Sequence, residues 1–318
     1  MTGATGFVGS HAVDELLESG YRVRCLVRAT SKLRWLEGKP VELVVGDLLS
    51  GDLAAAVDGV DKVIHCAGLT RGSPEALRAA NQRGTLALVK ACCESDGKPR
   101  FVLCSSQAAA GPSRPGRPRA VEDPPAPTSD YGRSKLAAER EALGAGDRIG
   151  VVIVRPGAVY GPRDEDTLPY FKMAAHGVVI APGVRRRLVQ VVHARDAAQA
   201  LRLAAERAVA LGNTYFVAHP QVLTWSQLAR AIGRATGRRT LTVRLPAIVL
   251  RGAGALMELL GRGGAAGELD GRRARDLIQR AWTCGTERTQ RELGWSPHYD
   301  SEDGLRATAE WYRAQGWL

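Results

Sequence analysis

A tyrosine and a lysine four residues apart carry the clearest chemical pattern in the chain. Tyr131 and Lys135 stand in the segment Tyr-Gly-Arg-Ser-Lys, and side chains at this spacing share one face of a helix. An ammonium beside a phenol favours the phenolate, so that the tyrosine can give and take a proton near neutral pH. A surface pair with the same spacing is the alternative interpretation.

A serine 25 residues before Tyr131 strengthens the functional interpretation. Ser106 follows the apolar run Arg100 to Cys104, which is typical of a buried strand. Ligands of doubly wound sheets bind outside the carboxyl ends of the strands. The Ser106 hydroxyl could therefore hold a substrate oxygen while Tyr131 moves the proton. A helix or turn cap is the alternative role for this serine.

The loop Thr2 to Gly9 has three glycines at a spacing of three and leads into an amphipathic stretch. Gly3 permits a tight turn, Gly6 lets the backbone approach a pyrophosphate, and Gly9 lets the following helix pack closely. The anion would lie at the helix N-terminus. We predict that this loop binds a dinucleotide through Gly3, Thr5, Gly6, Phe7, Val8 and Gly9.

The end of the next predicted strand bears on the choice of cofactor. An acid about twenty residues after the loop would hold the ribose 2′-hydroxyl of NAD, but Val27 and Arg28 stand there. An arginine fork matches a 2′-phosphate, which favours NADP and leaves NAD open, because Arg28 could also be a plain surface residue. Asp47 and Leu48 follow another predicted strand and are expected along the adenine.

Short β-branched runs alternate with helical stretches in the first half of the chain. Strands separated by helices predict β-α-β units and an α/β, Rossmann-type, doubly wound parallel sheet. The predicted strands are Arg22 to Val27, Val41 to Val45, Lys62 to Cys66, Arg100 to Cys104 and Val151 to Val154, and the predicted helices are His11 to Ser19, Leu77 to Glu94 and Ser134 to Leu143.

The second half of the chain lacks this regular alternation. We expect residues 1–156 to form the NAD(P)-binding domain, with returning segments at about 189–218, and residues 157–188 and 219–318 to form mainly a smaller substrate-binding lobe. Gly111 to Pro127 is rich in Pro and Gly and predicts a loop. The remaining predictions are strands at 189–192 and 214–217, helices at 225–236 and 247–260, and a glycine-rich connection at 261–271.

Taken together, the motifs resemble the extended short-chain dehydrogenases/reductases, which include the NAD-dependent epimerases and dehydratases. The resemblance runs from the glycine loop to Arg291–Pro297 and the tail helix ending at Trp311-Tyr312. It implies that Tyr131 is the acid/base, that Lys135 holds the nicotinamide ribose, that Ser106 orients the substrate oxygen and that Asn81 is a structural active-site asparagine. It also implies cofactor contacts from Ala67, Gly68, Pro156 and Val159.

Departures from the family pattern limit the reactions that the chain is expected to catalyse. Dehydratases of this kind carry an acidic pair after the catalytic Ser or Thr, whereas Gln107 and Ala108 follow Ser106 here. The Arg-Asp pair that sugar-nucleotide epimerases often show is absent from Leu188 to His193. The Val27-Arg28 pair resembles the dihydroflavonol-reductase and 3β-hydroxysteroid-dehydrogenase branch. We therefore predict a reductase or dehydrogenase acting on a ketone or secondary alcohol, with an NDP-sugar epimerase and a non-catalytic dinucleotide sensor or scaffold as alternatives.

Composition bounds the partners of the 318-residue chain, whose net charge is +11. A polyanion could match that charge, but the arginines are dispersed, so we expect a small-molecule substrate and no nucleic acid or membrane; Arg185-Arg186-Arg187 is the exception and could face an acidic ligand. The six cysteines form no C-x-x-C pair or zinc-like spacing, so we expect no metal and a cytoplasmic location. A homodimer is an expectation from the family.

Three further expectations concern His193, two tryptophans and the first residue. His193 is more often a structural hydrogen-bonder at such a strand end than a substrate contact, and Trp225 and Trp282 are expected to pack the lobe. The glycine loop normally follows a buried strand, and relatives usually have Val where Met1 stands. We therefore expect an open slot in the sheet, and hypothesise that the natural protein starts upstream of Met1.

Overall fold

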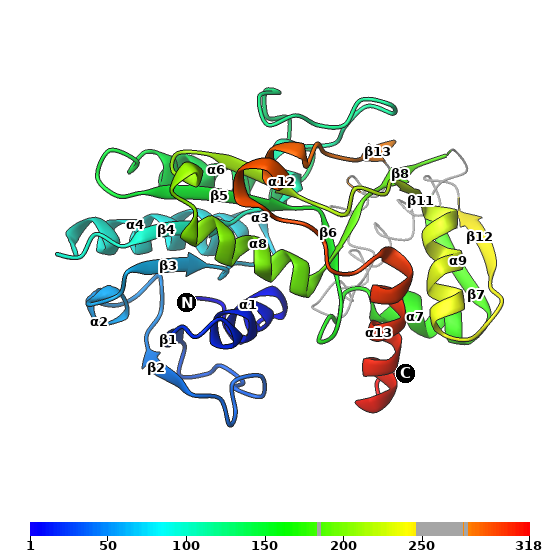
Figure 1. Cartoon of the computed structure of the whole chain (residues 1–318), viewed down its shortest axis with the longest axis horizontal. Helices are drawn as coiled ribbons and strands as arrows, with labels where there is room; N and C mark the ends of the chain where they lie inside the picture. The colour runs from blue at the N-terminus through cyan, green and yellow to red at the C-terminus, as the bar shows by residue number, and fades with distance from the viewer. Residues whose placement is uncertain (183–185, 246–275, 277–278) are drawn as a thin grey trace.

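The computed structural model describes residues 1–182, 186–245, 276 and 279–318. The helix predicted at 247–260, the connection predicted at 261–271 and Arg185 lie outside the described residues. Strands β3 (Lys62–His65), β4 (Arg100–Cys104), β5 (Val151–Pro156) and β10 (Thr214–Val217) lie in the middle of the part that is described (Figure 1), and their apolar residues are buried.

A parallel sheet forms the centre of the fold, as the alternating pattern predicted. One ladder pairs two strands, and a second has the order β10-β5-β4-β3. Strands β4 and β5 are almost wholly buried, which fits their Val, Ile and Leu content. The two strands of the first ladder are β1 (Val23–Val27) and β2 (Val41–Val45).

The two ladders are separated by a slot between β1 and β3. Thr2 forms an isolated parallel bridge to Leu26 on one side and to His65 on the other. Met1 O accepts a hydrogen bond from Leu26 N at 2.9 Å, and Thr2 N donates to Ile64 O at 3.1 Å. Beside them lies a cavity of about 600 Å³ that is lined by both strands. The slot expected from the sequence is therefore present.

Helices cover both faces of the sheet, which makes the fold doubly wound. α1 (Phe7–Glu18) and α8 (Ala194–Glu206) lie side by side on one face (Figure 1). Alternate residues of β4 divide between the two cores: Val102 packs with α1 and α8, and Phe101 packs on the other face. That face is covered by α2 (Ala54–Val57), α4 (Gly84–Glu94) and α6 (Asp130–Leu143). The short helix α3 (Pro74–Leu77) and the π-helical turn η1 (Arg78–Arg83) pack against α6.

Two predicted helix starts were wrong, and a third predicted helix is not α-helical throughout. α1 begins at Phe7 and not at His11, because Gly6 already occupies the N-cap position. α6 begins at Asp130 and not at Ser134, because the Ser129 side chain caps the helix by accepting from Gly132 N at 3.1 Å. The long helix predicted from Leu77 contains the π-helical turn η1.

A second group of elements follows β5 and encloses its own apolar cluster, which includes Phe171, Leu228 and Tyr312. The strand predicted at 189–192 is two strands, since β8 pairs with β11 and β13 while β9 pairs with β6. The assignment of domains stays a prediction. The elements are β6 (Ala158–Tyr160), α7 (Leu168–Ala175), β7 (Val178–Pro182), β8 (Leu188–Val189), β9 (Val191–His193), β11 (Leu223–Thr224), α9 (Trp225–Ala235), β12 (Leu241–Leu245), β13 (Ala281–Trp282) and α13 (Ser301–Ala314).

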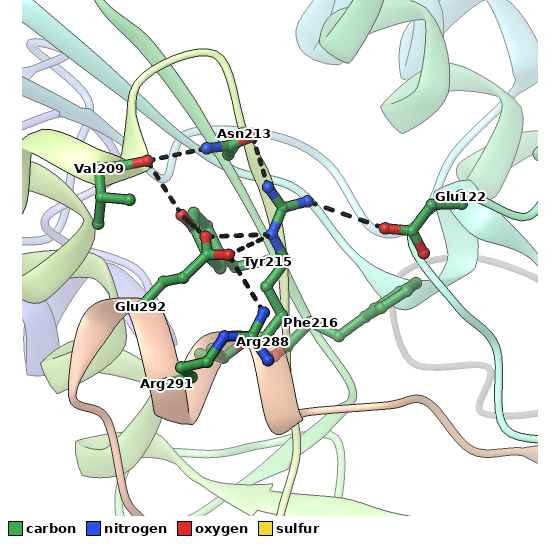
Figure 2. Close-up of polar contacts among 9 residues, drawn as sticks. Glu122, Val209, Asn213, Tyr215, Phe216, Arg288, Arg291 and Glu292 are labelled. Carbon is green, nitrogen blue, oxygen red and sulfur yellow. Dashed lines mark hydrogen bonds and ion pairs between the residues drawn. The ribbon is translucent and has the colours of Figure 1, made fainter.

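The tail is fastened to the sheet through α12 (Glu287–Leu293), as Figure 2 shows. Tyr215 of β10 donates to Glu292 Oε2 at 2.7 Å, and Arg288 Nη2 donates to Asn213 Oδ1 at 2.6 Å. Glu122 approaches Arg288 from the predicted loop at 111–127, at 4.0 Å. The network therefore joins three segments that are far apart in the sequence. The remaining short helices are α5 (Gln107–Ala110) and η2 (Ala208–Ala210).

Within the described part of the chain, no helix has both the length and the apolar character that a membrane span requires.

Candidate active site

The glycine loop has the geometry of a phosphate cradle. Gly3 has a φ of +69°, and a Cβ on it would lie 2.5 Å from Ala67 N, so a side chain is excluded. A Cβ on Gly9 would overlap Gly3 O. Gly6 is the N-cap residue of α1 and makes no side-chain cap hydrogen bond. The backbone N–H groups in the first turn of this 12-residue helix are therefore suited to bind an anion. The residues present therefore fit the pyrophosphate of a dinucleotide.

Arg28 lies exposed directly after β1, at the same edge of the sheet. Its N–H donates to Ser31 Oγ at 3.1 Å, and its carbonyl accepts from Ser31 N at 2.9 Å, so that the two residues form a tight turn. Asp47 follows β2 and accepts from Leu49 N at 2.8 Å. A Cβ on Gly84 would touch Leu48 at 3.4 Å, which places Leu48 against α4.

Lys135, Asn81 and Gly68 are brought together from three elements. Lys135 is buried and donates from Nζ to Cys104 O at 2.7 Å, and its burial lowers the pKa of the ammonium. A Cβ on Gly68 would lie 2.6 Å from Asn81 Oδ1 and 3.8 Å from Lys135 Nζ. The loop after β3 therefore has to pass close to both side chains.

Asn81 fastens this loop to α6. Its Oδ1 accepts from Leu69 N at 2.8 Å, and its Nδ2 donates to Leu69 O at 2.9 Å and to Ser134 Oγ at 2.8 Å. Asn81 is buried within the π-helical turn η1, a form that often occurs at functional sites. The asparagine thus joins the loop after β3 to α6.

Ser106 lies at the start of α5, and α5 packs against the start of α6. Ser106 Oγ accepts from Ala108 N at 3.1 Å, so the serine is a helix cap. Its hydroxyl hydrogen can still be donated to a ligand oxygen. A Cβ on Gly132 would overlap Ala108 O, so the glycine after Tyr131 permits the close contact between the two helices.

Pro156 and Val159 occupy the turn from β5 to β6 at the carboxyl edge of the sheet. Pro156 is buried and Val159 is half-buried. The predicted cofactor contacts therefore gather along one edge of the sheet, from the glycine loop to the end of β5.

The sequence motifs did not predict a buried hydrogen-bond network beside the site. Ser105 Oγ donates to Glu139 Oε1 at 2.5 Å, and Arg155 donates to both oxygens of the same carboxylate at 2.8 and 2.7 Å. Two signals could have found it: Glu139 lies four residues after Lys135 on one helix face, and Arg155 follows an unbroken apolar run.

A second missed contact joins the glycine loop to η1 through a buried histidine. His65 Nδ1 and Thr2 Oγ1 are 2.6 Å apart, and His65 Nε2 and Thr85 Oγ1 are 3.0 Å apart. Thr85 donates to Asn81 O at 2.6 Å. Burial lowers the pKa of His65 to about 3, so the imidazole is neutral and can both accept and donate.

His193 lies in a structural setting. It caps α8 by accepting from Arg195 N at 3.3 Å, and its ring centroid lies 4.0 Å from that of Tyr299. Trp225 lies 6.0 Å from Tyr170 between ring centroids, within the cluster of the second group of elements. Trp282 Nε1 donates to Asp276 O at 2.8 Å.

The basic cluster does not form one surface in the described residues. Arg187 is buried, and its Nη1 donates to Gln279 O at 2.9 Å, whereas Arg186 is exposed.

A parallel sheet with a glycine cradle at a helix N-terminus defines a dinucleotide-binding protein. Residues 1–218 match the NAD dependent epimerase/dehydratase family, and the chain belongs to this family, within the extended short-chain dehydrogenases/reductases. The family is enzymatic, and the relatives are reductases, dehydrogenases and epimerases. The protein is therefore an NAD(P)-dependent enzyme.

Similar proteins cover essentially the whole fold. A ceramide reductase of Caulobacter vibrioides is 33% identical over all of this chain and 95% of its own length. A putative dihydroflavonol 4-reductase of Synechocystis is 34% identical over 77% of this chain and 76% of its own length. The crystal structure of gox2253 superimposes with a TM-score of 0.83 at 29% identity, covering 100% of this chain and 98% of that one.

Proposed function

We propose that the protein is an NADP(H)-dependent oxidoreductase that interconverts a ketone and a secondary alcohol on a small or medium-sized molecule. The observation that carries the proposal is the close packing of α5 on α6 at Gly132. This packing brings the helix that Ser106 caps against the helix that carries Tyr131 and Lys135.

The roles follow from the chemistry of these side chains. When bound, the cofactor supplies or accepts the hydride. Ser106 donates a hydrogen bond to the substrate oxygen, and Tyr131 gives its proton to that oxygen during reduction or takes it during oxidation. The ammonium of Lys135, one turn from Tyr131, favours the phenolate. Asn81 holds the loop after β3 in place beside Lys135.

Two observations support reduction or oxidation over sugar-nucleotide chemistry. Gln107 and Ala108 supply no acid or base after Ser106, which a dehydratase would need. The Caulobacter and Synechocystis relatives are also named as reductases, a ceramide reductase and a putative dihydroflavonol 4-reductase. An NDP-sugar epimerase is the second candidate, because the family includes epimerases.

The preference for NADP rests on Arg28. It lies exposed at the end of β1, and Val27 and Arg28 stand where an acid would hold a ribose 2′-hydroxyl. A guanidinium at this place pairs with a 2′-phosphate. The glycine cradle fits either dinucleotide.

The decisive experiment compares two reactions in one preparation: NADPH-dependent reduction of a panel of ketones, and epimerisation of UDP-glucose. We expect turnover with ketones, and a fall of about 100-fold or more in kcat for Tyr131→Phe, since the acid/base is lost. NADPH should bind that variant normally. Tyr21→Phe, whose hydroxyl contacts Glu206 on the far side, serves as the control. Epimerisation without ketone reduction, or full activity of Tyr131→Phe, would overturn the proposal.

A further inference from the structure

A buried ion pair joins α6, the helix that carries Tyr131 and Lys135, to the end of β5. The side chains of Glu139 and Arg155 are 2% and 7% exposed, and they meet in a bidentate contact. Ser105 supplies a third hydrogen bond to the same carboxylate. All three hydrogen bonds are charge-assisted and shielded from water, which makes them strong and directional.

The position of each partner in its element gives the network a functional meaning. Ser105 directly precedes Ser106, and Arg155 directly precedes Pro156 at the turn into β6. Glu139 lies one helical turn beyond Lys135 on α6. One carboxylate therefore fixes the ends of β4 and β5 to the helix that presents Tyr131, while Lys135 is held separately by Cys104 O.

The ion pair also contributes to the electrostatic environment of Lys135. Glu139 acts on the Lys135 ammonium by opposing the effect of burial on its pKa. Among the described residues, the Cys66 and Cys104 thiols and His65 also act on Lys135, and the pKa of His65, about 3, keeps its ring neutral. Arg119 lies close enough to Arg155 to interact with it electrostatically.

We propose that Glu139 and Arg155 are positioning residues of the active site, which align Ser106 with Tyr131 and Lys135 and keep the net charge beside Lys135 balanced. The inference rests on the proposed role of Tyr131 as the acid/base. A buried pair gives little net stability against apolar residues of similar size. Alignment and charge balance are therefore the roles that the three-element contact supports.

The test is a pH titration of the Tyr131 phenol by phenolate absorbance, taken as the difference between each protein and the same protein carrying Tyr131→Phe. Glu139→Gln leaves the Arg155 charge unbalanced and should lower the apparent pKa of Tyr131 by about half a unit. Arg155→Met leaves the carboxylate unbalanced and should raise it by a similar amount. The double variant Glu139→Gln/Arg155→Met should return it to the wild-type value.

Further variants separate alignment from charge and from folding. Ser105→Ala removes one hydrogen bond and no charge, so it should lower kcat several-fold without moving the titration. Glu302→Gln, in an exposed ion pair with Arg234, is the control and should change neither. If one single variant does not fold, the sign of the shift in the other still tests the charge balance, and the double variant and Ser105→Ala still test the alignment.

The charge-balance role would be overturned if the pKa of Tyr131 shifted in the same direction in both single variants, or did not shift in either. The alignment role would be overturned if kcat were unchanged in both Ser105→Ala and the double variant. The titration uses no substrate, so its outcome does not depend on which reaction the protein catalyses. Opposite shifts in a protein without ketone turnover would refute the function and leave the charge balance intact.

Discussion

At the scale of the residue, Arg28 offers the most direct test of cofactor choice. Arg28→Ala should weaken NADPH binding by about 10- to 100-fold, because a charge-assisted contact to the 2′-phosphate is lost. NADH binding should change little. Arg22→Ala, also exposed and just before the other end of β1, is the matched control. Fluorescence titration of both cofactors measures the effect, and an equal loss for NADPH and NADH would contradict it.

Single residues also show what the sequence could and could not predict. Tyr131, Lys135 and Ser106 could be predicted because a local spacing or a strand end marks them. Glu139 and Arg155 stand on different elements, and their contact depends on how α6 packs on the sheet. A charged residue on a helix usually points to solvent, so the local signals at Glu139 and Arg155 do not show that the two side chains meet.

At the scale of the element, the contact between α5 and α6 depends on one glycine. Gly132→Ala should push the helices apart, since its Cβ would overlap Ala108 O, and overpacking of this kind costs about 1–3 kcal/mol. We expect a lower Tm and a loss of kcat at least 10-fold, as Ser106 moves away from Tyr131. Gly84→Ala, whose Cβ would meet Leu48 at an ordinary 3.4 Å, should keep both. A fully active Gly132→Ala protein would remove the main support for the proposed site.

The strands were easier to predict than the pairing between distant segments. Val151 to Val154 is a β-branched run between turn signals, and it forms most of β5. Helix α8 was missed because its buried face consists largely of alanine, which gives a weak apolar signal. The pairing of β7 with β12 joins Val178 to Leu241, and contacts over such separations are set by tertiary packing.

At the scale of the whole molecule, buried neutral histidines should make stability depend on pH. Burial lowers the pKa of His65 and of His193 to about 3 and that of His11 to about 4. These groups take up protons only in the unfolded chain as pH falls below about 6.5, so stability that is present above that pH is lost toward the folded-state pKa.

His193→Phe tests this dependence, because phenylalanine keeps the ring that faces Tyr299 and cannot titrate. The variant should be about 1 kcal/mol less stable at pH 7.5, where it lacks the helix cap. Between pH 7.5 and pH 4.5 it should lose about 2 kcal/mol less than the wild type. Urea unfolding at both pH values measures the difference, and parallel losses in the two proteins would contradict the assignment.

The slot between β1 and β3 sets a second property of the whole molecule, because apolar side chains from both faces of the sheet line it. Leu16 lines the slot from one face, and Val57 and Leu88 line it from the other. The buried Met1 ammonium donates to Arg24 O at 2.6 Å, and burial lowers its pKa.

An extended apolar segment fused ahead of Met1 would therefore pair with both strands, fill the cavity and replace the buried ammonium by an amide. Four added apolar, β-branched residues should raise the Tm by about 5 °C, as buried apolar area replaces empty space. NADPH should bind more tightly, because Thr2 and the glycine loop are then anchored from both sides. An added Gly-Ser-Gly-Ser segment is the control, since it brings no apolar side chains. Calorimetry and NADPH titration decide the matter: equal Tm values for the two extended proteins would mean that the slot does not accept a strand.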